Sequence, residues 1–212
     1  MQSEVDSEKE CVVVTGFGLF GNFKINASWE AVRRLADTGI AEQLGIKLML
    51  MEVPVEYDYV RQEIPRIWQQ HRPKLMVHVG VSGAAQEINL EKQAFNNGYR
   101  CPDVIDCVPE DNCCIPGAED FICSEIDMSL VCECVNNSCV GTFSCVSSDP
   151  GQYLCDFIYY TSLSINRNRA AFIHVPDLNK PYSAEQLSQG LKVAIAAMLE
   201  QVRAKDSVKP AV

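Results

Sequence analysis

The sequence predicts one α/β domain of three layers (α/β/α), in which helices cover both faces of a mainly parallel, mixed central sheet. Short apolar runs alternate with stretches of helical periodicity along most of the chain, which is typical of such a fold. A length of 212 residues favours a single large domain. The composition, 47% apolar and 22% charged, is that of a globular protein and excludes disordered, collagen-like and coiled-coil chains.

The first part of the chain is expected to alternate strands with helices. Its predicted strands are short and continuously apolar, as strands buried on both faces are, and they cover residues 11–15, 47–53 and 75–79. The intervening helices are recognised by apolar side chains at three- and four-residue spacing, and they cover residues 26–36 and 57–70. This order predicts parallel strands joined by helical crossovers.

Residues 95–123 interrupt this alternation, because Asn, Gly, Pro, Asp and Cys dominate there and no periodicity remains. We expect a long irregular excursion, which in a compact domain usually belongs to a site or an interface. The alternation then resumes as helix, strand, helix, strand and helix over residues 126–135, 141–146, 152–164, 170–175 and 183–203. Residues 1–10 are expected to form a disordered arm and residues 204–212 a flexible tail, so that 11–203 make up the domain.

The charge of the chain excludes several classes of partner. Lys and Arg number 18 and Asp and Glu 28, for a net charge of −10. Such a surface repels phosphate backbones, so nucleic-acid binding is not expected. No stretch reaches the roughly 18 apolar residues that span a bilayer, and the acidic N-terminus is unlike a signal peptide. We therefore expect a cytoplasmic protein with no membrane partner.

Nine of the eleven cysteines lie between Cys101 and Cys145. A secreted domain would use them as disulfides, but the total is odd and no export signal is recognisable. Zinc sites pair cysteines at wider spacing than the adjacent Cys113 and Cys114 or the alternating Cys132 and Cys134. We expect reduced thiols that hold no metal, with a disulfide and a zinc site as the alternatives.

A glycine-rich segment follows the first predicted strand. Residues 16–21 (GFGLFG) match the dinucleotide fingerprint G-x-G-x-x-G, and Glu52 near the end of the next strand could contact a ribose. However, Phe17 and Phe20 place bulky rings where a pyrophosphate needs bare backbone. We favour a turn that presents both rings to a small ligand, with plain core packing and a nucleotide-binding oxidoreductase as alternatives.

Cys155 differs from the other thiols because it follows a predicted strand and a turn with helix-start signals, Asp149 and Pro150-Gly151. The positive end of the helix dipole favours a thiolate there, and the first backbone amides can donate to an oxyanion. His174 ends the next predicted strand, at the edge where open α/β sheets bind ligands. The two could form a nucleophile–base pair. A buried structural cysteine is the alternative.

The other two histidines are expected to have no part in that chemistry. His78 alternates with valines inside an apolar strand, which is typical of a hydrogen-bonded core histidine. His71 lies near a predicted helix end beside Arg72, where solvent is expected to reach it.

Several segments together resemble the pyroglutamyl peptidase I family, the cysteine peptidases that remove an N-terminal pyroglutamyl residue (5-oxoproline). The resemblance follows the order of the chain from about residue 11 to 203, and it is most specific around Cys155 and His174, where it is closest to the vertebrate branch. The segments are TGFGLFG with NASW, residues 79–83 with 90–92, residues 149–156 and residues 171–176.

The resemblance implies a role for each matched residue: Cys155 as nucleophile, His174 as general base and Glu91 as the third catalytic residue. It also predicts a pocket for the pyroglutamyl ring, lined by Phe17, Phe20, Tyr153 and Leu154. No metal or organic cofactor is implied. The implied partners are small pyroglutamyl peptides, and both a monomer and a homo-oligomer are compatible with the family.

The chain departs from the family's pattern near the predicted site. Leu19 stands where the family has proline, Pro150 where it has alanine, and Gln152 where close relatives often have arginine. Asn89 and Gln93 also replace the usual residues beside Glu91. The alternative function is therefore a catalytically weak or inactive member that still binds pyroglutamyl peptides.

Overall fold

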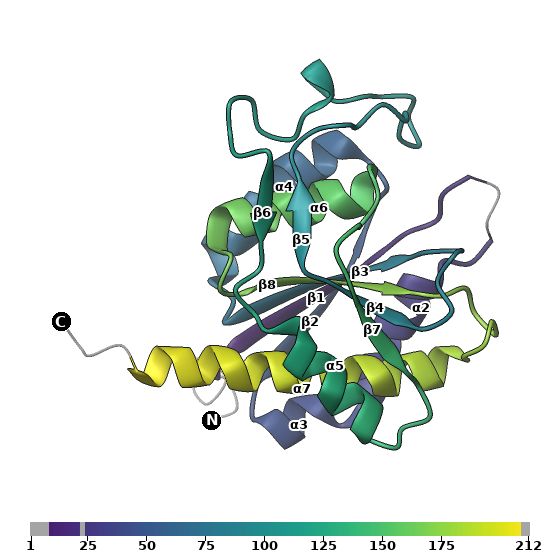
Figure 1. Cartoon of the computed structure of the whole chain (residues 1–212), viewed down its shortest axis with the longest axis vertical. Helices are drawn as coiled ribbons and strands as arrows, with labels where there is room; N and C mark the ends of the chain where they lie inside the picture. Colours follow the sequence, from purple (N-terminus) through teal and green to yellow (C-terminus); the bar gives the residue numbers. More distant parts are fainter. Residues whose placement is uncertain (1–8, 22–23, 209–212) are drawn as a thin grey trace, which may run out of the picture.

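A six-stranded sheet in the order β2-β1-β3-β8-β4-β7 forms the centre of the molecule (Figure 1). The computed structural model describes residues 9–21 and 24–208. The strands are β1 (Cys11–Phe17), β2 (Lys47–Val53), β3 (Leu75–Val81), β4 (Ile88–Glu91), β7 (Ser144–Ser147) and β8 (Ala170–Val175). Neighbouring strands are parallel except β4 and β8, which are antiparallel, so the sheet is mainly parallel and mixed, as predicted.

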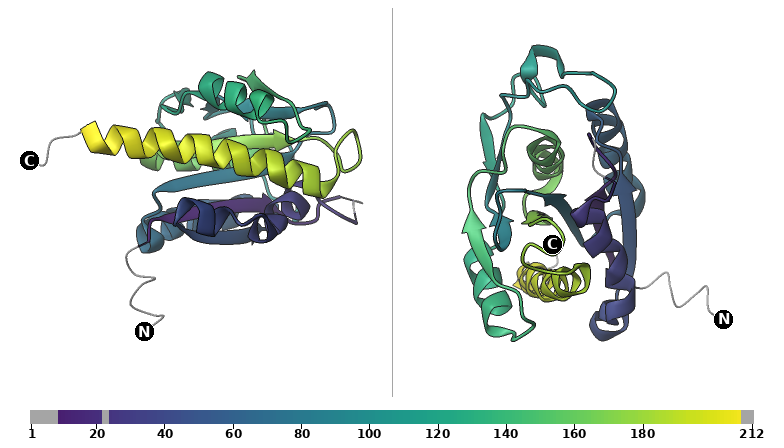
Figure 2. Two further views of the ribbon diagram at one scale, coloured as in Figure 1. Left: turned by 90° about the horizontal axis from the view of Figure 1, so that it is seen from below. Right: turned by 90° about the vertical axis from the view of Figure 1, so that its right-hand side faces the viewer.

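Helices cover both faces of this sheet. They are α2 (Ala27–Arg33), α3 (Ile40–Leu44), α4 (Tyr57–His71), α5 (Met128–Asn137), α6 (Leu154–Asn166) and α7 (Ala184–Val208), with the 3₁₀ helices η1 (Arg34–Thr38) and η2 (Glu110–Asn112). Val12 and Val14 of β1 are buried with α2, α5 and α7, whereas Val13 is buried with α4 and α6 on the opposite face. Figure 2 shows α6 and α7 on opposite sides of the sheet. Burial of both strand faces explains the continuous apolar runs of the sequence.

The segment predicted to be irregular, 95–123, is ordered at both ends. There β5 (Gln93–Phe95) and β6 (Phe121–Cys123) form an antiparallel pair that lies beside α6 (Figure 1). Tyr99 within the excursion is fully buried. The prediction of a wholly irregular segment is therefore wrong at its ends, because strands of three residues are too short to show periodicity.

The last helix, α7, continues to Val208, beyond the end near residue 203 that the sequence predicts. Ion pairs hold its final turns, because Asp206 contacts Lys74 at 2.7 Å and Arg169 at 2.8 Å. Lys74 also pairs with Glu10 at 2.9 Å. The rest of the predicted arm and tail, residues 1–8 and 209–212, lies outside the described residues. Among the described helices, none is both long and apolar enough to cross a bilayer.

Candidate active site

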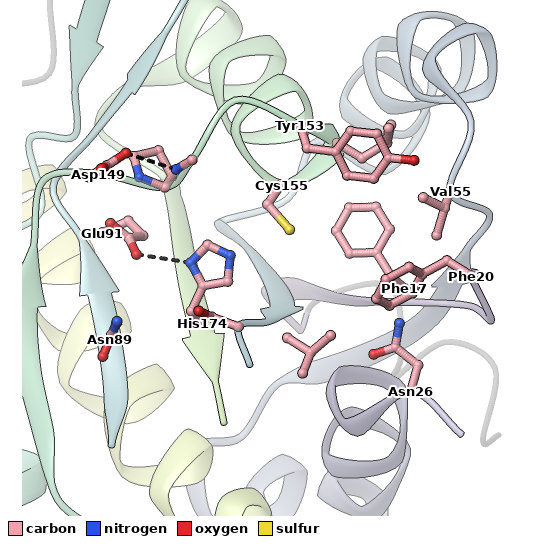
Figure 3. A pocket seen from close by; sticks show the side chains of 15 residues that line it. Phe17, Phe20, Asn26, Val55, Asn89, Glu91, Asp149, Tyr153, Cys155 and His174 are labelled. Carbon is pink, nitrogen blue, oxygen red and sulfur yellow. Dashed lines mark hydrogen bonds and ion pairs between the residues drawn. The ribbon is translucent and has the colours of Figure 1, made fainter. Parts of the chain in front are cut away.

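A pocket of about 300 Å³ opens where several strands end (Figure 3). Phe17 is the last residue of β1, Val81 is the last of β3, and Val55 follows β2. Ligands of open α/β sheets bind at this edge, and the volume is at the lower end of the range for ligand pockets. All seven residues of the predicted site line it: Cys155, His174, Glu91, Phe17, Phe20, Tyr153 and Leu154.

Glu91 and His174 are joined across the antiparallel strands β4 and β8. Glu91 pairs in register with Phe172, and Asn89 with His174, so Glu91 and His174 are diagonal neighbours on one face. Their contact is a hydrogen bond of 2.9 Å between His174 Nδ1 and Glu91 Oε1. Glu91 is fully buried, and its Oε2 atom is without a hydrogen-bond partner in the described part of the chain. This contact makes Nδ1 the protonated nitrogen and leaves Nε2 for another partner.

Cys155 is the second residue of α6, and its thiol lies beside the His174 ring (Figure 3). Burial by itself lowers the pKa of His174, but the Cys155 sulfur and the Glu91 carboxylate outweigh that effect and raise this pKa to about 10. The ring therefore favours the imidazolium form, and its positive charge lies beside the Cys155 sulfur.

The start of α6 leaves backbone donors available near that sulfur. Tyr153 is the N-cap residue, and its side chain accepts no hydrogen bond from the helix. The N–H groups of the first turn are therefore not used by the capping residue. The sequence predicts a helix start at residue 152, whereas α6 begins at Leu154. Before the helix, Asp149 Oδ1 accepts a hydrogen bond from Gly151 N at 3.1 Å and closes a turn. Pro150 lies in that turn and therefore does not enter α6.

Gly80 of β3 permits the close approach of Cys155 to the sheet. A Cβ atom at this position would lie 2.7 Å from Cys155 Sγ and 2.8 Å from Phe172 Cζ. Both distances are shorter than a non-bonded carbon contact allows, so only glycine fits without a shift of the thiol or the ring.

The pocket has two chemically different halves on either side of the Cys155 sulfur (Figure 3). Phe17, Phe20 and Tyr153 lie on one side, whereas Glu91 and Asn89 lie on the other. The first half offers flat apolar faces, and the second offers polar atoms next to the imidazole.

The loop that carries Phe17 is fixed by a small hydrogen-bond network. Phe17 N donates to Ser28 Oγ at 3.0 Å, and Asn26 Nδ2 donates to Gly18 O at 2.8 Å. The Phe17 ring is only 4% exposed, so it belongs to both the core and the pocket wall. A Cβ atom at Gly16 would lie 2.8 Å from Trp29 Cα, which shows that this glycine permits the packing of α2 against β1.

His78 is a core residue, as the sequence predicts. Its Nδ1 and Nε2 atoms lie 2.7 Å from Thr15 Oγ1 and 2.7 Å from Ser162 Oγ, respectively. Complete burial lowers its pKa to about 3, so the ring is neutral. His71, the last residue of α4, is half-buried.

Eight further residues line the pocket, and the sequence analysis does not predict them as binding residues. They are Asn26, Val55, Val81, Ser82, Asn89, Asp149, Pro150 and Gly151. Val81 and Ser82 could have been found from their place at a strand end. Asn26 is recognisable in the sequence only as a helix start, and in the structure it caps α2 by accepting a hydrogen bond from Ser28 N at 3.0 Å.

The cysteine-rich segment lines no part of this pocket with a thiol, since Cys155 is the only cysteine among the lining residues. The segment does touch the pocket wall from outside, because Cys145 Sγ lies 3.3 Å from Asn89 Oδ1 and the Tyr153 hydroxyl donates to Pro102 O at 3.0 Å. All eleven cysteines lie within the described residues, and all are free thiols. The described residues also contain no group of three or more His, Cys, Asp or Glu side chains arranged to hold a metal ion.

Comparison with known proteins gives one consistent result. The sequence profile of the pyroglutamyl peptidase family matches residues 10–205. Pyroglutamyl-peptidase 1 of Rattus norvegicus is 45% identical over 195 residues, which cover 92% of each chain, and that of Homo sapiens is 44% identical over 196 residues, which cover 92% of this chain and 93% of the human protein. The crystal structure of Bacillus amyloliquefaciens pyroglutamyl peptidase I superposes with a TM-score of 0.79 at 25% identity, covering 91% of this chain and 98% of that one. These matches confirm the predicted fold and function class, and the chain belongs to the pyroglutamyl peptidase family.

Proposed function

We propose that this chain is an active cysteine peptidase that hydrolyses the bond between an N-terminal pyroglutamyl residue and the next residue of a small peptide. The observation that carries the proposal is the convergence of Cys155, His174 and Glu91 in one pocket, with His174 and Glu91 hydrogen-bonded at 2.9 Å. Residues 11–203 would form the single peptidase domain. The expected location is the cytoplasm, and no metal, organic cofactor, nucleic acid or membrane is required.

The first step forms a thioester on Cys155. The thiolate attacks the pyroglutamyl carbonyl carbon, and the oxygen of the tetrahedral intermediate accepts hydrogen bonds from the first amides of α6. The His174 imidazolium then donates its Nε2 proton to the leaving nitrogen, and the carbon–nitrogen bond breaks. The shortened peptide departs with a free amine, and the pyroglutamyl group remains bound to the sulfur.

The second step regenerates the enzyme with water. Neutral His174 takes a proton from the water, whose oxygen attacks the thioester carbonyl carbon. The carbon–sulfur bond breaks, so pyroglutamate leaves as the acid and the thiolate re-forms beside the imidazolium. Throughout both steps Glu91 holds Nδ1–H and stabilises the positive ring.

The aromatic half of the pocket suits the pyroglutamyl ring. The lactam is flat and uncharged, and Phe17, Phe20 and Tyr153 offer it apolar faces. A free glutamyl residue would bring an ammonium and a carboxylate into the same space. Stripping water from these charges without a partner would cost several kcal/mol, which disfavours that substrate.

Hydrolysis of a fluorogenic pyroglutamyl amide tests the proposal. Wild type and Cys123→Ala, which changes an exposed thiol of β6, should turn over the substrate at the same rate. Cys155→Ala should be inactive and should still bind a pyroglutamyl peptide. Binding by wild type without turnover would identify the inactive alternative. Sedimentation of the same samples distinguishes a monomer from a homo-oligomer.

A further inference from the structure

Asp156 is a fully buried carboxyl group beside Cys155 that the reaction itself does not use. As the third residue of α6 it could cap its own helix, since an acidic side chain there often does. Its hydrogen bonds go to another segment instead. Phe95 N donates to Asp156 Oδ1 at 2.8 Å, and the Tyr99 hydroxyl lies 3.1 Å from Asp156 Oδ2.

The protons of this cluster can be counted. The Tyr99 hydroxyl has one proton, and it donates that proton to the backbone oxygen of Phe95, which can only accept. The contact between the Tyr99 hydroxyl oxygen and Asp156 Oδ2 then has no donor, unless the carboxyl group is protonated and donates. A protonated Asp156 completes a closed ring: Asp156 O–H to Tyr99 Oη, Tyr99 O–H to Phe95 O, and Phe95 N–H to Asp156 Oδ1. An ionised Asp156 would leave two oxygens facing each other in a buried place.

The electrostatic surroundings agree with this count. Burial raises the pKa of Asp156 to about 8 and outweighs the hydrogen bonds with Phe95 N and Tyr99, which act to lower it, while the nearby carboxylates of Asp149 and Glu91 raise it further. The titratable groups that interact with it come from several elements and are all acids: Tyr99, Glu91, Asp149, Cys114 and Tyr159. Arg61 of α4 is directed elsewhere, since it stands over the Phe157 ring and pairs with Asp58.

The ring connects two parts of the active site. Asp156 follows Cys155 in the first turn of α6, and Phe95 ends β5, which follows β4 and Glu91 after one residue. A second contact supports the same junction, because the Tyr159 hydroxyl donates to Glu91 O at 2.9 Å. The position of the thiol relative to the Glu91–His174 pair therefore depends on how α6 is held against β4 and β5.

We propose that Asp156 is a positioning residue that stays protonated at neutral pH and, through its ring with Tyr99 and Phe95, holds the helix turn that bears Cys155. This inference rests on the proposed function for its effect on catalysis, but the ring itself can be tested without activity. Ionisation of Asp156 would break the ring and displace the turn, so the enzyme would lose activity at alkaline pH for a reason separate from the titration of His174.

Asp156→Asn and Asp156→Ala provide the test. The amide of Asn can donate to Tyr99 and accept from Phe95 N without titrating, whereas Ala abolishes the ring. Asp37→Asn, at an exposed position of η1, is the matched control. The melting temperature, kcat and KM of all four proteins are measured between about pH 5 and 9.5.

The folded-state pKa lies above the unfolded one, so the stabilisation by the proton is lost as pH rises toward about 8. Wild type and Asp37→Asn should therefore lose melting temperature relative to Asp156→Asn up to about pH 8 and no further above it. Their kcat should fall more steeply above that pH than that of Asp156→Asn. Asp156→Ala should lose at least about tenfold in kcat at every pH with little change in KM.

Parallel melting and kcat profiles for wild type and Asp156→Asn would overturn the proposal. If Asp156→Asn does not fold, a carbon-13 titration of aspartate-labelled wild type decides instead, since one carboxyl group must keep its proton above about pH 6. If wild type has no activity, the proposed function fails. The melting profiles still show whether the hydrogen-bonded ring of Asp156, Tyr99 and Phe95 depends on the proton of Asp156.

Discussion

Glu91 Oε1 lies 2.9 Å from His174 Nδ1, although the two residues are 83 positions apart in the sequence. The bond exists because β4 runs antiparallel to β8, the one antiparallel junction in the central sheet among the described strands. The carboxylate is fully buried, so solvent screens it little. It thereby fixes the ring orientation and the tautomer of His174 and supports its positive charge.

Glu91→Gln should lower kcat by roughly 10²–10⁴, because the charge is lost and the amide can force the wrong tautomer on His174. KM and the melting temperature should change little, since the shape of the side chain is kept. The alkaline limit of activity should also move to lower pH, because this carboxylate raises the pKa of His174. Pre-steady-state and steady-state kinetics measure the effect, with Glu110→Gln on the exposed η2 as the control. Near-normal kcat would show that Glu91 is a bystander.

Cys155 should be the most reactive of the eleven thiols. The imidazolium of His174 lies beside it, whereas burial raises the pKa of Cys114 to about 12 and that of Cys145 to about 11. Limiting iodoacetamide at mildly acidic pH should therefore label Cys155 first and remove activity in proportion. Peptide mapping by mass spectrometry gives the order of labelling. First labelling of a residue between 101 and 145, with activity intact, would mean that the nucleophile is misassigned.

Gly80→Ala should impair catalysis through sterics alone. The added Cβ atom would lie 2.7 Å from Cys155 Sγ, so the thiol must move away from its present position. A displacement of about 1 Å in a reacting group costs on the order of 10²-fold in rate. Gly83→Ala is the matched control, because its Cβ atom would lie 4.0 Å from Asp177 Oδ2, an ordinary van der Waals contact. Equal kcat values for both variants would contradict the tight contact between β3 and α6.

Specificity should follow the aromatic half of the pocket. Pyroglutamyl, prolyl and glutamyl amides of one fluorophore compare a neutral lactam with rings or chains that carry an ammonium group. Only the first should be hydrolysed efficiently, and the charged substrates should be at least about 10²-fold poorer in kcat/KM because their charges find no partner there. Phe17→Leu should raise KM for the pyroglutamyl substrate and should not improve hydrolysis of the prolyl and glutamyl amides. Similar turnover of all three amides would refute the proposed pocket.

Local signals predicted the parts of the fold that depend on nearby residues. The apolar runs identified β1, β2, β3 and β8, and the alternation around His78 identified a core histidine. The turn before residue 155 placed Cys155 near a helix start, which the structure confirms within two residues. These features follow from the sequence because periodicity, caps and turns act over a few residues.

The parts that depend on distant contacts could not be predicted in this way. The strand β4 has only four residues and shows no recognisable pattern, so the sequence does not predict its pairing with β8. Only the family resemblance therefore points to Glu91 as a site residue. The sequence does not predict the burial of Tyr99 either, since that burial depends on Asp156 and Phe157, more than fifty positions later.

The pH dependence of stability should report the state of His78. Its folded-state pKa is about 3, against 6.5 for a free histidine, so the unfolded chain binds the proton more tightly. The stabilisation is thus present above about pH 6.5 and is lost as pH falls toward 3. Between about pH 7 and 5 this single group should remove roughly 2 kcal/mol from the free energy of unfolding.

The variant His78→Asn cannot titrate and should lack this loss, whereas His71→Asn, at the half-buried end of α4, should behave as wild type. Urea unfolding of the three proteins at both pH values measures the difference. A loss in His78→Asn as large as that in wild type would assign the acid sensitivity to other groups.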